Sequence, residues 1–271
     1  MDSKFTSVEG HKAHYWEGGT GFPVLMLHGV GPGTSIIGNY GPVLEPLSKS
    51  GLHLFAMDLI GFGQSDRKNG KPYFDVELWV RQAEALIALM PDGPIGVAGH
   101  SMGGALALKV AARSKRVVKV MTSCTVGTRY PINQALTDFW SKPADRAALR
   151  QAMGRMMHAS EALTDDMIED RWKQLTAPGY PEYFSELFAD PKQSLLDAAI
   201  LSDEELSSIT ADVVMLHGRE DQPCPPDATT MVLAKRLKAA DVHLLGQCGH
   251  NLPRERSADY IRLALATFAK P

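Results

Sequence analysis

The sequence has no long hydrophobic run. Within its 271 residues no stretch of about 18 apolar residues occurs, so no segment is predicted to cross a membrane. The first residues are not followed by the apolar segment that a secretory signal requires. Cysteine is scarce as well, and Cys124, Cys224 and Cys248 are widely spaced and form no CxxC pair or disulfide framework. We therefore expect a protein of the reducing cytoplasm with no membrane partner.

An excess of charge of one sign is also lacking. Lys and Arg number 28 and Asp and Glu number 31, which leaves a net charge of −3. Such a chain offers no basic surface to phosphate backbones, so we expect no nucleic-acid partner. The 9 histidines include no HExxH pair, and neither the GxGxxG pattern nor a P-loop lysine occurs. We expect neither a metal nor a cofactor.

What the sequence does contain is a recurring pattern of short apolar runs that stop at glycine or at a polar residue. Unbroken apolar runs are typical of central parallel strands, which are buried on both faces. They cover 23–28, 52–57, 95–98, 117–121, 212–216 and 242–245, after a short antiparallel opening at 4–8 and 13–16. Helical patterns alternate with them at 76–89, 101–114 and 261–268. This alternation predicts an α/β fold with a mostly parallel central sheet flanked by helices.

One block breaks the alternation. From about 126 to 205 no strand-like run occurs, and helical patterns follow one another at 131–141, 144–158, 165–176 and 181–200. Either this block is an independent helical domain, or it is inserted between two strands of one sheet. Because strand and helix patterns resume at 212–268, we favour the insertion. The predicted organisation is a core of residues 1–125 and 206–271 with a helical cap, or lid, at 126–205.

A candidate nucleophile lies between an apolar strand and an apolar helix. Residues 99–103, Gly-His-Ser-Met-Gly, fit the pattern GxSxG. In such a turn the serine is strained, and the glycines two positions away avoid collisions with neighbouring backbone. The hydroxyl then projects above the sheet, where the N-terminus of the next helix favours developing negative charge. A plain glycine turn is the alternative, but the context favours Ser101 as a nucleophile.

A serine nucleophile needs a base, and the base needs an acid that orients it. With this type of turn they follow in the order serine, acid, histidine. The run 212–216 is followed by Glu220 and Asp221, and the run 242–245 is followed by His250. Side chains that follow parallel strands meet at one edge of the sheet. We therefore expect Ser101, Asp221 and His250 to form a catalytic triad, with Glu220 as the rival acid.

Serine-dependent hydrolysis also needs N–H groups that bind the negative oxygen of the tetrahedral intermediate. One is the backbone N–H of Met102, next to the nucleophile. The other is expected in the glycine-rich loop at 28–33, and we favour the N–H of Val30. Three glycines let this loop lie close over a substrate, so Gly31 is a predicted substrate contact. A plain glycine turn is again the alternative.

Together, HGxG at 28–31, GxSxGG at 99–104, GRxD at 218–221 and GH at 249–250 resemble the α/β-hydrolase fold family over essentially the whole chain. Within the family, the sequence looks most like the meta-cleavage product hydrolases. These enzymes cut a carbon–carbon bond in 2-hydroxy-6-oxo-hexa-2,4-dienoates. The features that carry the likeness are residues 26–33, Asn39-Tyr40, residues 101–104 and Arg171-Trp172 on a helix of the insertion.

The resemblance implies that Asn39 and Arg171 hold the carboxylate end of the substrate, with Trp172 as a further contact. A guanidinium fork suits a carboxylate, although on its own Arg171 also fits the solvated face of a charged helix. Two positions depart from the pattern. The residue before the nucleophile is usually asparagine in that group and here is His100, and the residue after the base is usually tryptophan and here is Asn251. Both flank the reacting centre, so we expect them to contact the other end of the substrate.

The favoured function is a cofactor-free serine hydrolase that cleaves a carbon–carbon bond in a small acidic compound from aromatic ring catabolism, a 2-hydroxy-6-oxo-dienoate. Ser101, or a water activated by His250, would attack the ketone. The alternative with the same triad is a carboxylesterase, lactonase or amide hydrolase, and a ligand-sensing protein on this scaffold is a third class. The expected partner is a small-molecule substrate, and a homodimer is the assembly left open.

Overall fold

The computed structural model describes residues 1–160 and 163–269 of the chain. Among these residues eight strands form one sheet, in the order β1-β2-β4-β3-β5-β6-β7-β8. β2 pairs antiparallel with both β1 and β4, and the other neighbours are parallel, so the predicted mostly parallel sheet is confirmed. In chain order the strands are Asp2–Val8, His11–Gly18, Phe22–Leu27, Leu52–Met57, Ile95–His100, Val117–Ser123, Asp212–Gly218 and Ala240–Leu245.

The central strands are apolar because both of their faces are covered. β5 is buried at every position and β3 at every position but one. Successive side chains of a strand point to opposite faces of the sheet. Accordingly, Leu25 and Leu27 of β3 belong to one hydrophobic cluster, whereas Val24 and Met26 belong to a second. The unbroken apolar runs of the sequence are therefore a consequence of a sheet packed between two layers of helices.

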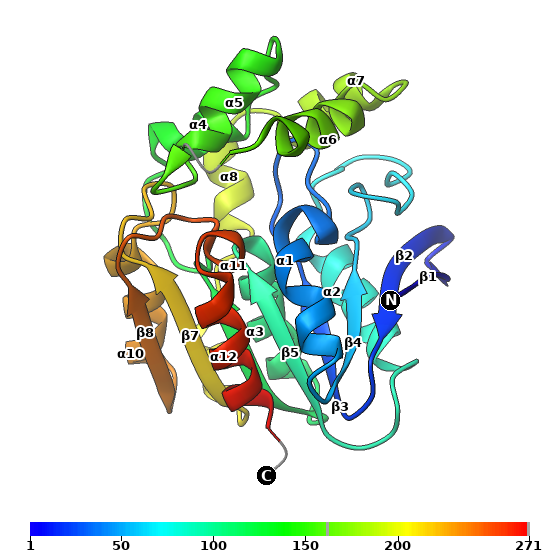
Figure 1. The fold of residues 1–271 in the computed structure, drawn as a ribbon, viewed down its shortest axis with the longest axis vertical. Helices are drawn as coiled ribbons and strands as arrows, with labels where there is room; N and C mark the ends of the chain where they lie inside the picture. The colour runs from blue at the N-terminus through cyan, green and yellow to red at the C-terminus, as the bar shows by residue number, and fades with distance from the viewer. Residues whose placement is uncertain (161–162, 270–271) are drawn as a thin grey trace.

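Helices cover both faces of the sheet (Figure 1). One face is covered by α1 (Ile36–Ser48), α11 (Leu252–Glu255) and α12 (Ser257–Phe268). The other face is covered by α2 (Val76–Ile87), α3 (Met102–Arg113), α9 (Asp203–Ser208) and α10 (Thr230–Arg236). A 3-10 turn at Pro226–Ala228 precedes α10. The sequence pattern does not predict α1, because Pro42 and Pro46 lie within it. Among the described residues, no helix has the length and apolar character needed to span a membrane.

Between β6 and β7 the described residues form a run of short helices: α4 (Gln134–Phe139), α5 (Arg146–Gly154), α6 (Asp165–Leu175), α7 (Tyr180–Leu187) and α8 (Lys192–Asp197). Figure 1 shows α4 to α7 gathered at one end of the molecule, beyond the parallel strands. The single helix predicted at 181–200 is wrong, because Pro191 has no N–H with which to continue α7, and α8 begins after it. Helix α9 spans the predicted boundary at 205 and packs on α3. The extent of the cap stays a prediction.

Candidate active site

Ser101 lies in the turn between β5 and α3, with φ 55° and ψ −119°. Such a conformation costs a residue other than glycine roughly 1–3 kcal/mol, so it persists only where the surroundings enforce it. A Cβ atom on Gly99 would lie 2.1 Å from the carbonyl oxygen of Gly103, and one on Gly103 would lie 2.3 Å from that of Leu27. The strained turn predicted from GxSxG is therefore present, and both glycines are required by close backbone contacts.

Three side chains from distant parts of the chain meet at this turn. The His250 Nε2 lies 2.9 Å from the Ser101 Oγ, and the His250 Nδ1 lies 2.7 Å from the Asp221 Oδ2. Asp221 follows β7 and His250 follows β8, so the ends of parallel strands bring both residues beside the nucleophile. Asp221 and His250 are buried, and Ser101 is half-buried. This is the arrangement that a nucleophile, a base and an acid that orients the base require.

The rival acid has other partners. The Glu220 Oε2 accepts a hydrogen bond from the Cys248 N–H at 3.1 Å, and its Oε1 forms an ion pair with Arg219 at 2.9 Å. The structure thus brings Asp221, rather than Glu220, into contact with His250.

The electrostatics of Asp221 and His250 favour an ion pair. The Asp221 Oδ2 also lies 3.0 Å from the His217 Nε2, and its Oδ1 accepts from the Cys224 N–H at 2.9 Å. Burial alone would raise the pKa of the Asp221 carboxyl, but the charge of His250 and the hydrogen bonds from both imidazoles hold that pKa below its usual range. Burial disfavours a charged His250, yet the Asp221 carboxylate outweighs it and raises the pKa of His250 well above its usual value.

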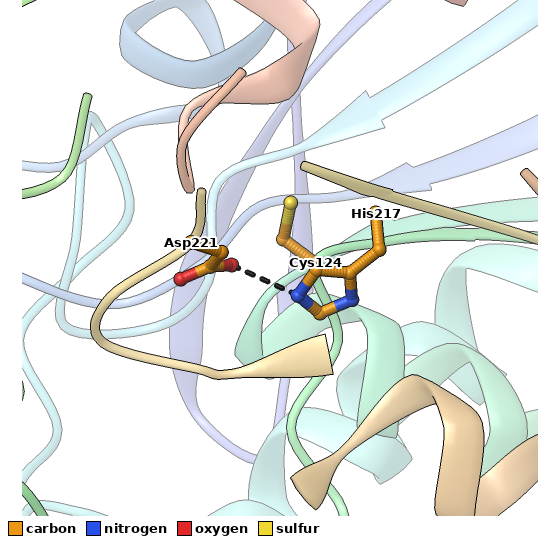
Figure 2. A group of neighbouring side chains, drawn as sticks. All are labelled: Cys124, His217 and Asp221. Atoms are coloured by element: carbon orange, nitrogen blue, oxygen red, sulfur yellow. Dashed lines mark hydrogen bonds and ion pairs between the residues drawn. The ribbon is translucent and has the colours of Figure 1, made fainter. Parts of the chain in front are cut away.

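Behind Asp221 lies a group of potential metal ligands. Figure 2 shows Cys124, His217 and Asp221 as neighbours, with His217 bonded to the carboxylate, and their ligand atoms lie within 4.8 Å of one another. A second such group joins Asp221 to Cys224 and His250. Burial raises the pKa of the Cys124 thiol well above its usual value. The His217 side chain and the backbone N–H of Cys224 are hydrogen-bonded to Asp221, and we interpret them as the support that orients its carboxylate.

The two backbone N–H groups predicted to bind an oxyanion belong to residues close to Ser101. Among the described residues, neither the Val30 N–H nor the Met102 N–H donates to another group. The loop that carries Val30 passes directly beside the nucleophile, since a Cβ on Gly29 would lie 2.9 Å from the Ser101 Cβ. The Val30 carbonyl accepts from the Trp140 Nε1 at 3.4 Å, which ties the loop to the cap. Both N–H groups are therefore available to a substrate oxygen.

A cavity opens at Ser101 and His250. Four of the residues predicted to bind substrate line it, namely Asn39, His100, Arg171 and Asn251. Gly31 and Trp172 do not line it, and their substrate contacts stay predictions. Gly31 makes room for a ring of the cap, since a Cβ there would lie 2.2 Å from Phe139. The indole of Trp172 lies 5.3 Å from the guanidinium of Arg146 and packs within the cap.

Arg171 is a buried cation that forms no ion pair with a carboxylate of the described residues. Its side chain points inward from α6 and is 7% exposed, which rules out the solvated helix face. Its Nη1 donates to the Pro32 carbonyl and to the Thr34 Oγ1, both at 2.9 Å. Burial, together with the nearby charge of Arg254, lowers the pKa of Arg171 to about 10. Since Arg171 forms no ion pair with any described carboxylate, the cavity contains a positive charge that a bound anion would neutralise.

Each of the other polar side chains of the cavity has a polar atom without a hydrogen-bond partner among the described residues. The Asn39 Oδ1 accepts from the Gly29 N–H at 2.8 Å, which leaves its NH2 group for a ligand. The His100 Nδ1 lies 3.1 Å from the Ser123 Oγ, and burial lowers the pKa of His100 well below its usual value, so this imidazole is neutral. The Asn251 Oδ1 is buried and has no partner among the described residues. A donor on the substrate would satisfy it.

Sequence reasoning missed the apolar wall of the cavity and one of its polar residues. The wall comes from the cap and consists of Phe139, Met153, Met156, Met157 and Leu163. Methionines on one side of the pattern 144–158 were the available signal, but such a stripe equally fits core packing. Thr34, which holds Arg171, lies in a loop with no pattern that marks it.

Comparisons with known proteins agree with this geometry. The family model of the alpha/beta hydrolase fold matches residues 23–256. The chain is 31% identical to a 2-hydroxy-6-oxo-2,4-heptadienoate hydrolase of Pseudomonas putida, over 90% of this chain and 88% of the relative. It is 29% identical to a 2-hydroxymuconate semialdehyde hydrolase of Pseudomonas sp. (strain CF600), over 94% and 89%. A variant of the meta-cleavage product hydrolase from Pseudomonas fluorescens IP01, complexed with acetates, superimposes with a TM-score of 0.91 at 29% identity, covering 98% of this chain and 97% of that one.

Proposed function

The chain belongs to the α/β-hydrolase fold family and most resembles its meta-cleavage product hydrolases, and on that premise we propose that Ser101, His250 and Asp221 cleave a carbon–carbon bond in a small acidic 2-hydroxy-6-oxo-dienoate. The observation that carries the proposal is the position of Arg171. This buried guanidinium, which no described carboxylate neutralises, lines the same cavity as Ser101 and His250. A substrate that carries a carboxylate at one end and a ketone further along would engage both groups at once.

The proposed reaction begins when the 2-hydroxyl proton of the dienol moves to C5, which converts the dienol into a diketone. The Ser101 Oγ then forms a bond to C6 and passes its proton to the His250 Nε2, 2.9 Å away. Negative charge develops on the C6 oxygen, where the N–H groups of Val30 and Met102 bind it. Asp221 stabilises the imidazolium that forms on His250.

Collapse of this intermediate breaks the C5–C6 bond. Its electron pair moves through the conjugated system to the C2 oxygen, and the proton held by His250 is transferred to the leaving fragment to give a hydroxydienoate, which leaves His250 neutral. Arg171 and Asn39 hold the adjacent carboxylate during this step and disperse its charge. A water molecule, deprotonated by His250, then attacks the acyl-serine and releases the carboxylic acid. The cycle is redox-neutral, and each proton transfer is assigned to His250 or to the substrate itself.

The cavity also distinguishes the two ends of the substrate. Arg171, Thr34 and Asn39 form its polar side, whereas the cap supplies methionine, leucine and phenylalanine side chains elsewhere. His100 and Asn251 stand beside His250, so they border the ketone and its acyl substituent. We propose that these two residues adapt the site to the acyl end.

The test is the substrate dependence of an Arg171 substitution. A charge-assisted hydrogen bond to a carboxylate contributes about 1.5–3 kcal/mol in a partly dry site. Arg171→Ala is expected to reduce kcat/KM for a 2-hydroxy-6-oxo-dienoate by roughly 10- to 150-fold. It should change turnover of a neutral p-nitrophenyl ester little, and Arg171→Lys should recover part of the loss. Equal losses on both substrates would assign Arg171 to packing of the cap, and no loss on either would overturn the proposal.

A further inference from the structure

Arg171 also borders a second and larger cleft. This outer cleft runs between α6 and the loop that precedes α1. The wall between the outer cleft and the active-site cavity is thin, because Arg171 lines both. The chain from Gly33 to Thr34 adds to this wall, and a Cβ on Gly33 would lie 2.4 Å from the Arg171 carbonyl oxygen. A molecule in the outer cleft is therefore one side chain away from the active-site cavity.

A second guanidinium lines the outer cleft. The Arg254 Nε donates to the Gly38 carbonyl at 2.6 Å, and its Nη2 donates to the Ile37 carbonyl at 3.1 Å. These bonds hold the Arg254 side chain, which extends from α11, against the first turn of α1. A Cβ on Gly38 would lie 3.9 Å from the Arg171 Nη2, so the two guanidinium groups approach the same glycine. Burial is the main cause of the lowered pKa of Arg171, and the like charge of Arg254 adds to it.

The remaining charges of the outer cleft do not cancel these two. Lys173 lines it as a third cation, and Asp170 and Asp58 are its carboxylates. Asp58 is 1% exposed and is engaged by the Ile36 N–H at 2.7 Å and the His14 Nδ1 at 2.8 Å. Asp170 is exposed and its charge favours the protonated form of Arg254, but neither Arg254 nor Arg171 forms an ion pair with a carboxylate among the described residues. The outer cleft is thus lined by three cations and two carboxylates. The Asp170 carboxylate is exposed to solvent, and the Asp58 carboxylate is already hydrogen-bonded within the protein.

We infer that the outer cleft is the entry site for a carboxylate ligand, in which Arg254 and Lys173 attract the anion and Arg171 receives it at the wall shared with the active-site cavity. The inference rests on the proposed function, since it assumes that the ligand of the inner cavity is acidic. Charges at the rim of a site act mainly on the association rate and on its salt dependence. Arg254 is therefore expected to govern how fast the anion arrives, and Arg171 how long it stays.

The experiment is stopped-flow binding of sorbate, a dienoate that carries the carboxylate but no ketone. Binding is followed by tryptophan fluorescence, since Trp16 lines the outer cleft and Trp140 bonds to Val30 beside the inner cavity. The variant is Arg254→Gln, which keeps a hydrogen-bond donor toward α1 but removes the charge. Its control is Arg262→Gln, which removes one positive charge from an exposed site on α12. Arg171→Ala is measured in parallel.

We expect Arg254→Gln to slow association of sorbate by about three- to tenfold and to flatten its decrease with salt. The Arg262→Gln control should match the unmodified protein, and Arg171→Ala should mainly accelerate dissociation. If Arg254→Gln behaves like the control while Arg171→Ala weakens binding, the entry site is refuted and the proposed function stands. If neither arginine affects sorbate, both the entry site and the proposed function are refuted.

Discussion

The backbone N–H of His250 donates to the carbonyl of Met156 at 2.8 Å, which joins the loop of the catalytic base to the cap. The N–H of Asn251 donates to the same carbonyl at 3.1 Å. The two segments are in close contact at Gly249, because a Cβ there would lie 2.7 Å from the backbone nitrogen of His158. The cap segment that carries the methionine wall is thus fixed directly to the residue that we propose takes the proton from Ser101. A shift of the cap would therefore also shift His250 relative to Ser101.

Glu255 bridges the same two segments, and its substitution tests this coupling. Its carboxylate accepts from the His158 N–H at 2.7 Å and from the Gly249 N–H at 3.1 Å. Glu255→Gln is expected to lower the free energy of unfolding by about 1–2 kcal/mol, because the charge-assisted bonds weaken in a half-buried site. It should also reduce kcat several-fold through misalignment of His250. Urea denaturation and steady-state kinetics measure both, with the exposed Glu204→Gln as control. Unchanged kcat with lowered stability would restrict Glu255 to a structural role.

Ser101→Ala should lower kcat by at least about 10³-fold without loss of the fold, because the members of a triad act as a unit. Circular dichroism checks the fold, and Ser207→Ala on the exposed side of α9 is the matched control. Alanine keeps the Cβ atom and the strained backbone of the turn, so the stability of the variant should be close to that of the unmodified protein. A fully active variant would show that another group attacks the substrate.

The two adjacent acids should differ sharply. Asp221→Asn is expected to reduce kcat by roughly 10³- to 10⁴-fold, because an amide cannot stabilise the imidazolium on His250 and favours the wrong tautomer. Glu220→Gln should remain within a few-fold of the unmodified protein, since its carboxylate contacts Arg219 and the Cys248 N–H instead. The reverse result would mean that the loop after β7 presents Glu220 to the base.

The raised pKa of His250 predicts the direction of the pH dependence. His250 must be neutral to accept the Ser101 proton, and the Asp221 carboxylate favours its charged form. The acidic limb of kcat/KM should therefore have its midpoint above 6.5, the usual value for histidine, with activity lost as the pH falls through it. The residual activity of Asp221→Asn should show a midpoint at lower pH. A neutral ester as substrate keeps ionisation of the substrate out of the profile, and a midpoint below 6.5 in the unmodified protein would contradict the account.

The sequence predicted the parts of the molecule whose residue types have a single physical explanation. Apolar runs that end at glycine require a covered parallel sheet, and the turn around Ser101 requires glycine at 99 and 103. The ends of strands then bring Asp221 and His250 together across 29 residues of sequence. These constraints act locally or through the order of strands, so they are readable without coordinates.

Features that depend on contacts between distant helices could not be predicted in this way. Whether Arg171 points to solvent or inward depends on how α6 lies against the loop at Pro32 and Thr34, which its charged neighbours in sequence do not reveal. Trp172, next to it on the same helix, points elsewhere for the same reason. The break between α7 and α8 was readable at Pro191, but the apolar pattern continues across it.

The most direct test of the central claim is product analysis with 2-hydroxy-6-oxo-2,4-heptadienoate, the compound named for the relative that is 31% identical. The account predicts that its yellow dienolate absorption disappears, that one equivalent of acetate is released per equivalent consumed, and that Ser101→Ala abolishes both signals. Persistence of the absorption and absence of acetate, in a preparation that still hydrolyses p-nitrophenyl acetate, would contradict carbon–carbon cleavage and leave an esterase.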